Sequence, residues 1–183
     1  MSKENADKEQ KRSFKREVFS WIACIVVTIL LTEFILNFVI INANIPSGSM
    51  ENTIMTNDKL IALRTSYWFN DPKRGDIIIF KYPDDETEWF IKRVIALPGE
   101  TVLVKDGKVY INGSKKALSE PYIKEEPVED FGPYKVPKNG YFVMGDNRNN
   151  SNDVREWETH YVSRDEVLGK AWFRYYPSIK VIK

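Results

Sequence analysis

Cysteine and histidine are almost absent from this sequence. Its 183 residues include one cysteine, Cys24, and one histidine, His160. A single cysteine cannot form an intramolecular disulfide, and it excludes a metal site built on several thiolates. A single histidine likewise excludes a metal site rich in histidine. Nothing in the sequence implies a metal or an organic cofactor.

An excess of charge of either sign is absent as well. The chain has 27 Lys and Arg residues against 26 Asp and Glu residues, so it lacks the strongly basic surface of nucleic-acid-binding proteins. Aromatic residues make up 13% of the chain, which favours packed structure over disorder. The length suits one domain and an additional anchoring segment.

The first apolar run is long enough to cross a membrane. Residues 1–17 are polar and highly charged, which predicts a solvated, disordered tail, and residues 18–41 are mostly apolar. A helix over 18–41 would be about 36 Å long at ~1.5 Å per residue, against about 30 Å for a bilayer core. The cations of the tail predict a cytoplasmic N-terminus by the positive-inside rule. Everything after Ile41 is then expected on the outer side of the cell membrane, in a single-pass protein.

Residues 18–41 have three other interpretations: a cleaved secretory signal, a buried core helix and an amphipathic helix in the membrane plane. The apolar core of a secretory signal is shorter, at roughly 7–15 residues, and the length also disfavours a core helix. Glu33 and Asn37 lie four residues apart and share one helix face. This polar pair counts against a spanning helix, which remains the favoured interpretation.

After Ile45 the pattern changes to short runs that favour β-strands. Runs rich in Val, Ile, Phe, Tyr and Trp occur at 58–63, 76–82, 88–96, 101–105, 108–111, 141–144 and 169–176, separated by turn-forming residues. Lys105-Asp106-Gly107-Lys108, between two runs, is a strong signal for a two-residue hairpin. Residues 42–183 are therefore predicted to form a mainly β domain of antiparallel sheets, barrel-like or sandwich-like. Within it, residues 113–138 are expected to form an irregular excursion, and residues 163–167 one short helical turn.

The first candidate for chemistry is the segment Pro46-Ser47-Gly48-Ser49-Met50, a few residues past the apolar run. Pro46 fixes its φ angle, and Gly48 permits a tight backbone path beside a ligand. The two serines could supply a nucleophile and a hydroxyl donor. Taken alone, a segment of this kind is more typical of a linker.

Lys92 is the second candidate. On a strand, Phe90, Lys92 and Val94 share one face, although this pattern alone is also typical of a solvated lysine on an edge strand. Serine is a poor nucleophile until a base removes its proton, and a lysine with a pKa of about 10.4 is almost fully protonated at pH 7. Desolvation by apolar neighbours lowers the pKa of a lysine. Lys92 could then act as the general base for Ser49.

The third candidate is the polar segment 145–155, which follows the strand predicted at 141–144. A segment this rich in Asp, Asn and Arg is usually a loop, and its side chains can also form an ordered hydrogen-bonded scaffold. Asp153 and Arg155 can form an ion pair that fixes the loop. Ser151 could hydrogen-bond a neutral lysine amine.

Together these segments make the chain resemble the type I signal peptidases, in particular the compact single-anchor kind of Gram-positive bacteria. The resemblance covers nearly the whole chain after the basic tail. Its matching blocks, in the order of the family, are Pro46–Ile54, Arg74–Phe80, Phe90–Glu100 and Gly145–Arg155. Four blocks in the same order make the match highly specific. One departure is Asn52, where many members of the family have proline.

The resemblance implies a serine endopeptidase that removes signal peptides from exported precursor proteins at the outer face of the membrane. Ser49 would be the nucleophile and Lys92 the general base of a Ser–Lys dyad. Ser47 would stand at the position of the oxyanion donor, and Ser151 would orient Lys92. The implied partners are precursor proteins and membrane lipid, with no nucleic acid, and the chain is expected to be monomeric.

The resemblance also assigns supporting and substrate-binding residues. Asp153 and Arg155 match the supporting ion pair of the family, and Asp146 matches its structural carboxylate. The substrate pockets of the family accept small residues, usually alanine, at the first and third positions before the cleaved bond. In this sequence they would be lined by Ile45, Phe90 and Ile91.

Three rival functions have less support. A Ser-His-Asp triad would need His160, which has no surrounding signature. A self-cleaving repressor with Ser–Lys chemistry would need an N-terminal DNA-binding domain in place of the apolar run. An anchored β domain that only binds exported chains would not require Ser49 and Lys92 together.

Overall fold

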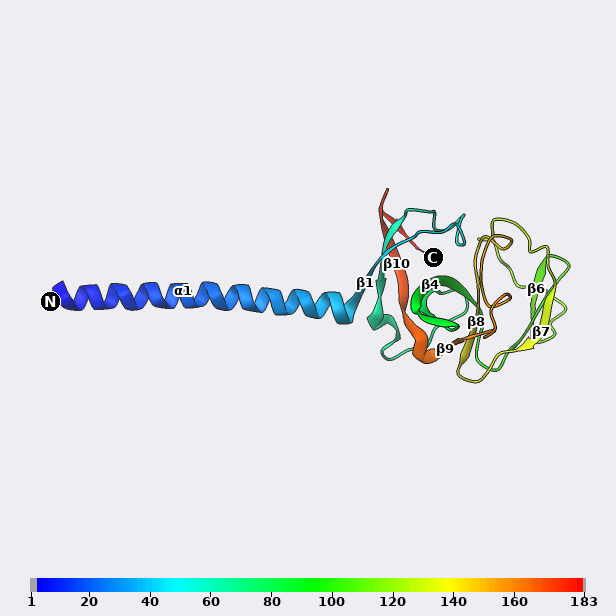
Figure 1. Cartoon of the computed structure of the whole chain (residues 1–183), viewed down its shortest axis with the longest axis horizontal. Coiled ribbons are helices and arrows are strands. Elements are labelled where there is room, and N and C mark those ends of the chain that lie inside the picture. The colour runs from blue at the N-terminus through cyan, green and yellow to red at the C-terminus, as the bar shows by residue number, and fades with distance from the viewer. Residues whose placement is uncertain (1–2, 183) are drawn as a thin grey trace. The chain divides into compact units, whose positions relative to one another are not determined.

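The computed structural model describes residues 3–182, with side chains from residue 14 onward. The chain divides into two compact units, residues 1–39 and 40–183. The first unit is a helix, α1 (Lys3–Phe34), which continues as the π-helical segment η1 (Ile35–Val39) (Figure 1).

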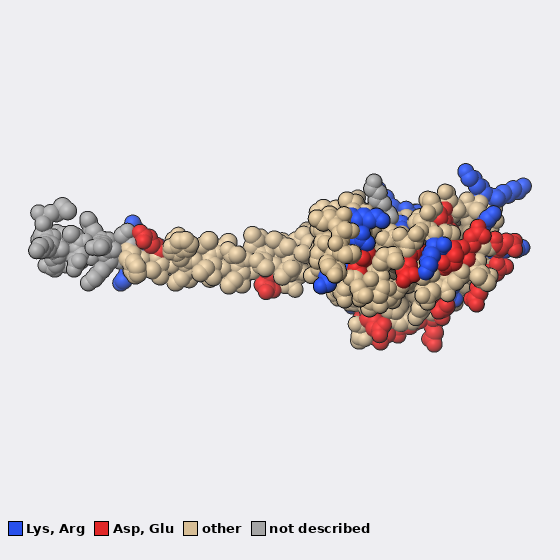
Figure 2. Space-filling view, turned by 90° about the horizontal axis from the view of Figure 1, so that it is seen from above, with Lys and Arg blue, Asp and Glu red and all other residues tan. Residues whose placement is uncertain are grey.

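The candidate membrane span extends from Phe14 to Val39, and its length and composition suffice to cross a bilayer. Figure 2 shows charged side chains at the start of this stretch and one acidic side chain further along, with an uncharged surface between them. The helix ends before Ile41, where the apolar run was expected to end. Ile40 and Ile41 instead pair with Leu63 and Ala62 as part of a strand, in keeping with the preference of β-branched residues for sheets.

The charged tail also differs from its expected disorder. Residues from Lys3 onward belong to α1, whereas residues 1 and 2 lie outside the described part. Lys, Glu, Gln and Ala dominate this segment, and all are good helix formers. Further along the helix, Asn37 donates hydrogen bonds to the backbone oxygen of Glu33 (2.8 Å) and to its carboxylate (3.0 Å). The polar pair is thus partly satisfied within its own helix.

The second unit consists of antiparallel sheets, as predicted. The larger sheet has the order β1-β2-β10-β3-β4-β8-β9, with β11 paired to β10, and the smaller sheet has the order β6-β5-β7. The strands are β1 (Ile40–Asn44), β2 (Lys59–Leu63), β3 (Ile77–Tyr82), β4 (Asp85–Ala96), β5 (Thr101–Lys105), β6 (Lys108–Ile111), β7 (Phe131–Lys135), β8 (Gly140–Met144), β9 (Val162–Ser163), β10 (Val167–Tyr176) and β11 (Lys180–Val181). Two 3-10 turns, η2 (Arg64–Tyr67) and η3 (Arg164–Glu166), complete the unit, and η3 confirms the turn predicted at 163–167.

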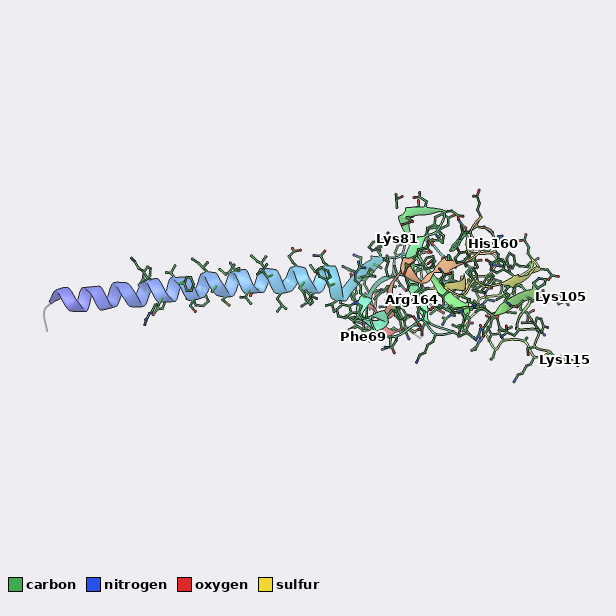
Figure 3. All side chains as sticks on the ribbon, turned by 90° about the horizontal axis from the view of Figure 1, so that it is seen from below. Phe69, Lys81, Lys105, Lys115, His160 and Arg164 are labelled. Carbon is green, nitrogen blue, oxygen red and sulfur yellow. The ribbon has the colours of Figure 1, made fainter. Side chains whose placement is uncertain are left out.

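The hairpin between β5 and β6 is confirmed in register and turn type. Lys105 pairs with Lys108, and Asp106 and Gly107 both have positive φ angles, of 49° and 74°. Two positive φ angles match the twist of a two-residue hairpin. Lys105 lies at one end of the β domain (Figure 3).

The excursion at 113–138 is irregular only in part, because it contains β7. This strand pairs with β5 at the edge of the smaller sheet. The Gly132-Pro133 pair in its sequence argues against a strand, since proline in a sheet is confined to edge strands and bulges. For this reason the strand was not predicted.

Strand β3 lies between two hydrophobic cores. Ile78 and Phe80 join the larger core, whereas Ile77 and Ile79 join the smaller one. A continuous apolar run is what a strand buried on both faces requires. Its neighbour β4 pairs with it so that Lys92 lies opposite Ile78. The fold therefore carries this lysine into apolar surroundings.

Candidate active site

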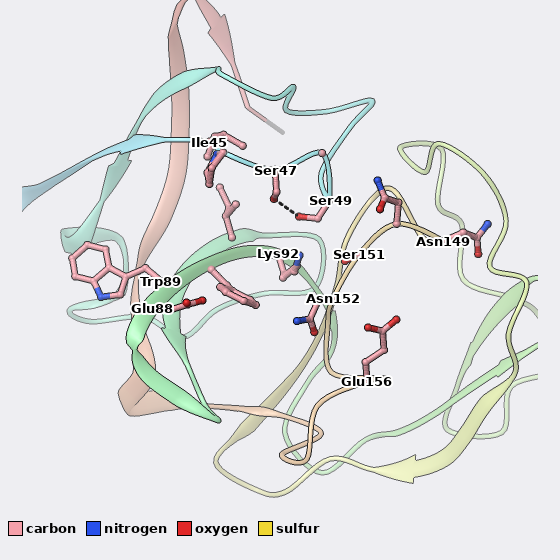
Figure 4. A pocket seen from close by; sticks show the side chains of 15 residues that line it. Ile45, Ser47, Ser49, Glu88, Trp89, Lys92, Asn149, Ser151, Asn152 and Glu156 are labelled. Atoms are coloured by element: carbon pink, nitrogen blue, oxygen red, sulfur yellow. Dashed lines mark hydrogen bonds between the residues drawn. The ribbon is translucent and has the colours of Figure 1, made fainter.

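A pocket of about 740 Å³ lies between the segment after β1, the strand β4 and the loop after β8 (Figure 4). Its lining residues are Ile45, Pro46, Ser47, Gly48, Ser49, Glu88, Trp89, Phe90, Ile91, Lys92, Asn149, Asn150, Ser151, Asn152 and Glu156. The structure thus brings together the serines, the lysine and the apolar residues that the sequence singled out. The predicted Asp146, Asp153 and Arg155 do not line the pocket.

The loop that carries Ser49 is held by tight turns and by buried anchors. The Glu51 amide donates to the Gly48 carbonyl (3.1 Å), and the Ile54 amide donates to the Met50 carbonyl (2.8 Å). Met50 and Ile54 are buried in the smaller core. The nucleophile candidate therefore stands on a rigid segment, because its neighbours are packed into the domain.

Ser49 itself is mostly buried, with 7% of its surface exposed. Its carbonyl oxygen accepts a hydrogen bond from the Asn147 amide (3.1 Å), which ties this loop to the one after β8. The hydroxyl oxygens of Ser47 and Ser49 lie 3.5 Å apart, and Ser47 is exposed at the pocket. Both hydroxyls thus face the same space.

Lys92 is buried without a polar partner. Only 3% of its surface is exposed, and its amine lies 5.6 Å from the centre of the Phe90 ring. In the described part of the chain, the amine forms no hydrogen bond and no ion pair. It lies below the Ser49 hydroxyl in the view of Figure 4. The amine therefore faces the pocket in an apolar setting.

Burial lowers the pKa of Lys92 from 10.5 to about 8. Desolvation is the largest cause, because an ammonium ion loses its hydration in apolar surroundings. The negative charge of Asp153 opposes this effect, and the positive charge of Arg155 adds to it. A lysine with this pKa supplies an appreciable fraction of neutral amine near neutral pH.

Asp153 organises the loop that carries Ser151. Its carboxylate accepts hydrogen bonds from the Gly145 amide (3.0 Å) and the Ser151 hydroxyl (2.9 Å), and it pairs with Arg155 (2.8 Å). The predicted ion pair is confirmed. The predicted hydrogen bond between Ser151 and Lys92 is not formed, because the hydroxyl donates to the carboxylate, which is a stronger acceptor. Ser151 itself lines the pocket.

Asp146 forms a buried ion pair that the sequence did not reveal. Arg93 donates to both carboxylate oxygens, at 2.8 and 2.7 Å, and the Thr53 hydroxyl donates to one of them at 2.5 Å. The Tyr122 ring covers the Arg93 guanidinium at 3.9 Å. Arg93 follows Lys92 on β4 and so points to the opposite face. A charged residue in an apolar strand signals a buried partner, and this signal was available in the sequence.

A second buried ion pair joins the excursion to the loop after β8. Arg148 is fully buried and makes two hydrogen bonds to the Glu120 carboxylate, at 2.6 and 3.0 Å. Nearby, Lys124 pairs with Glu51 of the serine loop at 2.7 Å. Residues 120–124 therefore bridge both loops of the pocket. These partners are 28 and 73 residues apart in the chain, so no local pattern predicts them.

Asn52, the departure from the family pattern, is one of the bridging residues. Its φ angle is 89°, and its side chain donates to the carbonyls of Tyr122 (3.0 Å) and Ile123 (3.3 Å). Proline holds φ near about −65° and has no such donor. The loop at Asn52 is therefore fixed by side-chain hydrogen bonds. Its backbone has a conformation that proline cannot adopt.

His160 lies away from the pocket. Its Nδ1 atom is 2.6 Å from the Val154 carbonyl oxygen, and its ring packs edge-on against Phe131 (5.3 Å) and Tyr134 (5.6 Å). It is not among the pocket residues, and Figure 3 places it on a different part of the domain from Lys81 and Arg164. The chain's only histidine thus fills a structural role, which leaves no histidine for a triad with Ser49.

The antiparallel β fold places a buried serine and a buried lysine of lowered pKa in one pocket. This combination defines a candidate serine hydrolase. The family model "Signal peptidase, peptidase S26" matches residues 18–176. A probable signal peptidase I-2 of Synechocystis sp. is 44% identical over 161 residues, covering 85% of this chain and 72% of that protein. Signal peptidase I of Bacillus amyloliquefaciens is 34% identical over 185 residues, covering 96% and 97%.

A crystal structure of a signal peptidase I from Enterococcus faecalis V583 is also similar, at 36% identity and a TM-score of 0.48, covering 55% of this chain and 97% of that one. The family model and the two relatives span most of the chain. The chain therefore belongs to the S26 family of signal peptidases, which are serine peptidases. Its apolar N-terminal helix fits the single-pass membrane anchor of such an enzyme.

Proposed function

We propose that this chain removes signal peptides from exported precursors with Ser49 as the nucleophile and Lys92 as the general base. The observation that carries the proposal is the setting of Lys92, which is buried, unpaired and directed into the pocket that Ser49 also lines. A neutral amine is the form that can accept the serine proton.

In this mechanism the Ser49 hydroxyl attacks the carbonyl carbon of the cleaved bond while its proton passes to Lys92. The oxyanion that forms accepts hydrogen bonds from the Ser49 amide and the Ser47 hydroxyl. The ammonium of Lys92 then protonates the leaving amine, which releases the mature protein. Water attacks the remaining ester on Ser49, with Lys92 again taking a proton, and frees the signal peptide.

The surrounding residues hold this pair in place. Ser151 accepts a hydrogen bond from the Lys92 amine when the two approach, since its own hydrogen is committed to Asp153. Asp153 and Arg155 fix that loop, and Asp146 fixes the loop after β8 through Arg93. We assign these residues a positioning role.

The apolar residues of the pocket select the substrate. Ile45 is buried, Phe90 and Ile91 are half-buried, and all three line the pocket. A small apolar lining favours small residues before the cleaved bond, because a larger side chain would have to displace packed neighbours. The substrates are therefore exported precursors with small residues, such as alanine, at those positions.

The rate of cleavage should rise with pH through about 8 and level off above it. Lys92 must be neutral to act as a base, and its pKa lies at about 8. At pH 7, roughly one tenth of the maximal kcat/KM is expected, because about one molecule in ten then carries the neutral amine. A pH profile of precursor cleavage in detergent measures this. A rate that stays flat from pH 5 to 9 would argue against Lys92 as the base.

We also propose that the β domain lies on the outer side of the cell membrane. Residues 1–17 contain the cations that the positive-inside rule places in the cytoplasm. A protease added to intact cells stripped of their wall should then degrade the β domain. Degradation only after the membrane is opened would reverse the orientation.

A further inference from the structure

The pocket carries more negative than positive charge. Its ionisable lining residues are Glu88, Lys92 and Glu156. When Lys92 is neutral, as the proposed mechanism requires, two carboxylates remain with no cation among the lining residues. Neither carboxylate forms a hydrogen bond or an ion pair within the described part of the chain. Both are exposed and so available to a ligand.

In the view of Figure 4, the two glutamates lie on opposite sides of Lys92. Glu88 precedes Lys92 by four residues on β4, which is about 13 Å at ~3.3 Å per residue. It is therefore too far away to pair with the amine. Glu156 follows the Ser151 loop, beyond Asn152 in the figure, and its charge acts on Lys92 by raising the pKa of the amine.

Two features indicate that this charge meets a ligand rather than a neighbour. Lys92 is an unpaired, almost fully buried polar group aimed into the same pocket. At the Glu88 end, Lys81 pairs with Glu86 at 3.1 Å, and Arg64 holds its guanidinium over the Trp89 ring at 5.7 Å. Neither cation is among the lining residues. Among the described residues, the two carboxylates thus have no partner.

We propose that Glu88 and Glu156 make the pocket select precursors with basic rather than acidic side chains near the cleaved bond. The inference rests on the proposed function, in which the cleaved bond lies between Ser49 and Lys92. An extended precursor chain in the pocket then continues on both sides of the cleaved bond. One glutamate therefore faces residues before the bond and the other faces residues after it, within about four residues for Glu88.

Each glutamate should change kcat/KM only modestly between precursors that differ in one charged side chain. Pairs of exposed charges change equilibrium constants by about two- to fivefold, and salt screens them within about 10 Å at 0.1 M. A lysine in the precursor should therefore raise kcat/KM about threefold over glutamine at the same position, and a glutamate should lower it about threefold. Both effects should shrink in 0.5 M NaCl.

The experiment uses the full chain in detergent and a reference precursor that is neutral around its cleavage site. Lys, Gln and Glu are placed singly at each of the five positions before and after the bond, except for the small residues that the pocket requires. The wild type should favour Lys over Gln over Glu on both sides. Glu88→Gln should remove the preference on one side, and Glu156→Gln should remove it on the other.

Matched controls are Glu86→Gln and Glu158→Gln, which neutralise nearby carboxylates outside the pocket lining. Both should keep the wild-type preference. Equal rates for Lys, Gln and Glu in the wild type would overturn this inference, as would a preference that survives in the double variant. Failure to cleave the neutral reference precursor would instead contradict the proposed function itself, so the two failures are distinguishable.

Discussion

Replacing Lys92 with methionine is expected to lower precursor cleavage at least a hundredfold and to make the folded domain more stable. Methionine has a similar length and suits the apolar surroundings, but it cannot accept a proton. Loss of a general base lowers rates by about 10²–10⁴-fold, so kcat/KM should fall at least a hundredfold. Cleavage of a precursor by equal amounts of folded wild type and Lys92→Met measures this.

The gain in stability follows from the pKa of Lys92. Folding lowers this pKa from 10.5 to about 8, which costs on the order of 3 kcal/mol at neutral pH, at about 1.4 kcal/mol for each factor of ten. The unfolded chain binds the proton more tightly, so the cost is complete below pH 8 and vanishes as the pH rises to 10.5. Thermal unfolding of Lys92→Met should therefore show its largest gain over the wild type below pH 8.

Lys105→Met is the matched control, since Lys105 is exposed at the β5–β6 hairpin. It should retain cleavage and show no gain in stability. Lys92→Met that cleaves at the wild-type rate would contradict the role of Lys92 as base. A variant that loses both activity and stability would instead mean that Lys92 is paired in the folded protein.

Gly145→Ala is expected to lower cleavage strongly by forcing the two loops of the pocket apart. A Cβ atom on Gly145 would approach the Ser49 carbonyl oxygen and the Ser151 hydroxyl closer than 3.0 Å, a distance that real Cβ atoms essentially never show. One of these contacts is backbone and cannot rotate away. A displacement of about 1 Å near the reacting groups costs about a hundredfold in rate. Cleavage assays and thermal unfolding on the same preparation measure both effects.

Gly113→Ala separates this effect from the general cost of replacing a glycine. Gly113 has a φ angle of 68°, and a Cβ atom there would have no neighbour within 4 Å. Its replacement should cost about 1 kcal/mol in stability through backbone strain and leave cleavage unchanged. Wild-type cleavage by Gly145→Ala would show that the packing between Ser49 and Ser151 is not needed.

The sequence predicts those parts of the structure that depend on neighbouring residues. Alternation on a strand correctly grouped Lys92 with apolar Phe90, and the Asp106-Gly107 pair correctly predicted a hairpin. Asp153 and Arg155 are two residues apart, so their ion pair follows from the loop sequence alone. In each case the interaction is decided within a few residues.

The parts that escaped prediction depend on distant segments. Ile40 and Ile41 look like the end of an apolar helix, and only pairing with β2 makes them a strand. Arg93 and Asp146 are 53 residues apart, and their pairing requires β4 and β8 to be neighbours. The bridge from Glu120 to Arg148 likewise exists only because the excursion folds back over both loops of the pocket.

The most direct test of the proposed mechanism is the cleavage of one exported precursor by Ser49→Ala beside the wild type. The substitution removes one buried hydroxyl and no structural hydrogen bond of the backbone, so the variant should fold like the wild type. Ser114→Ala, which changes an exposed serine in a distant turn, is the matched control and should cleave at the wild-type rate. We expect no cleavage above background by folded Ser49→Ala, and substantial cleavage by this variant would contradict the role of Ser49 as the nucleophile.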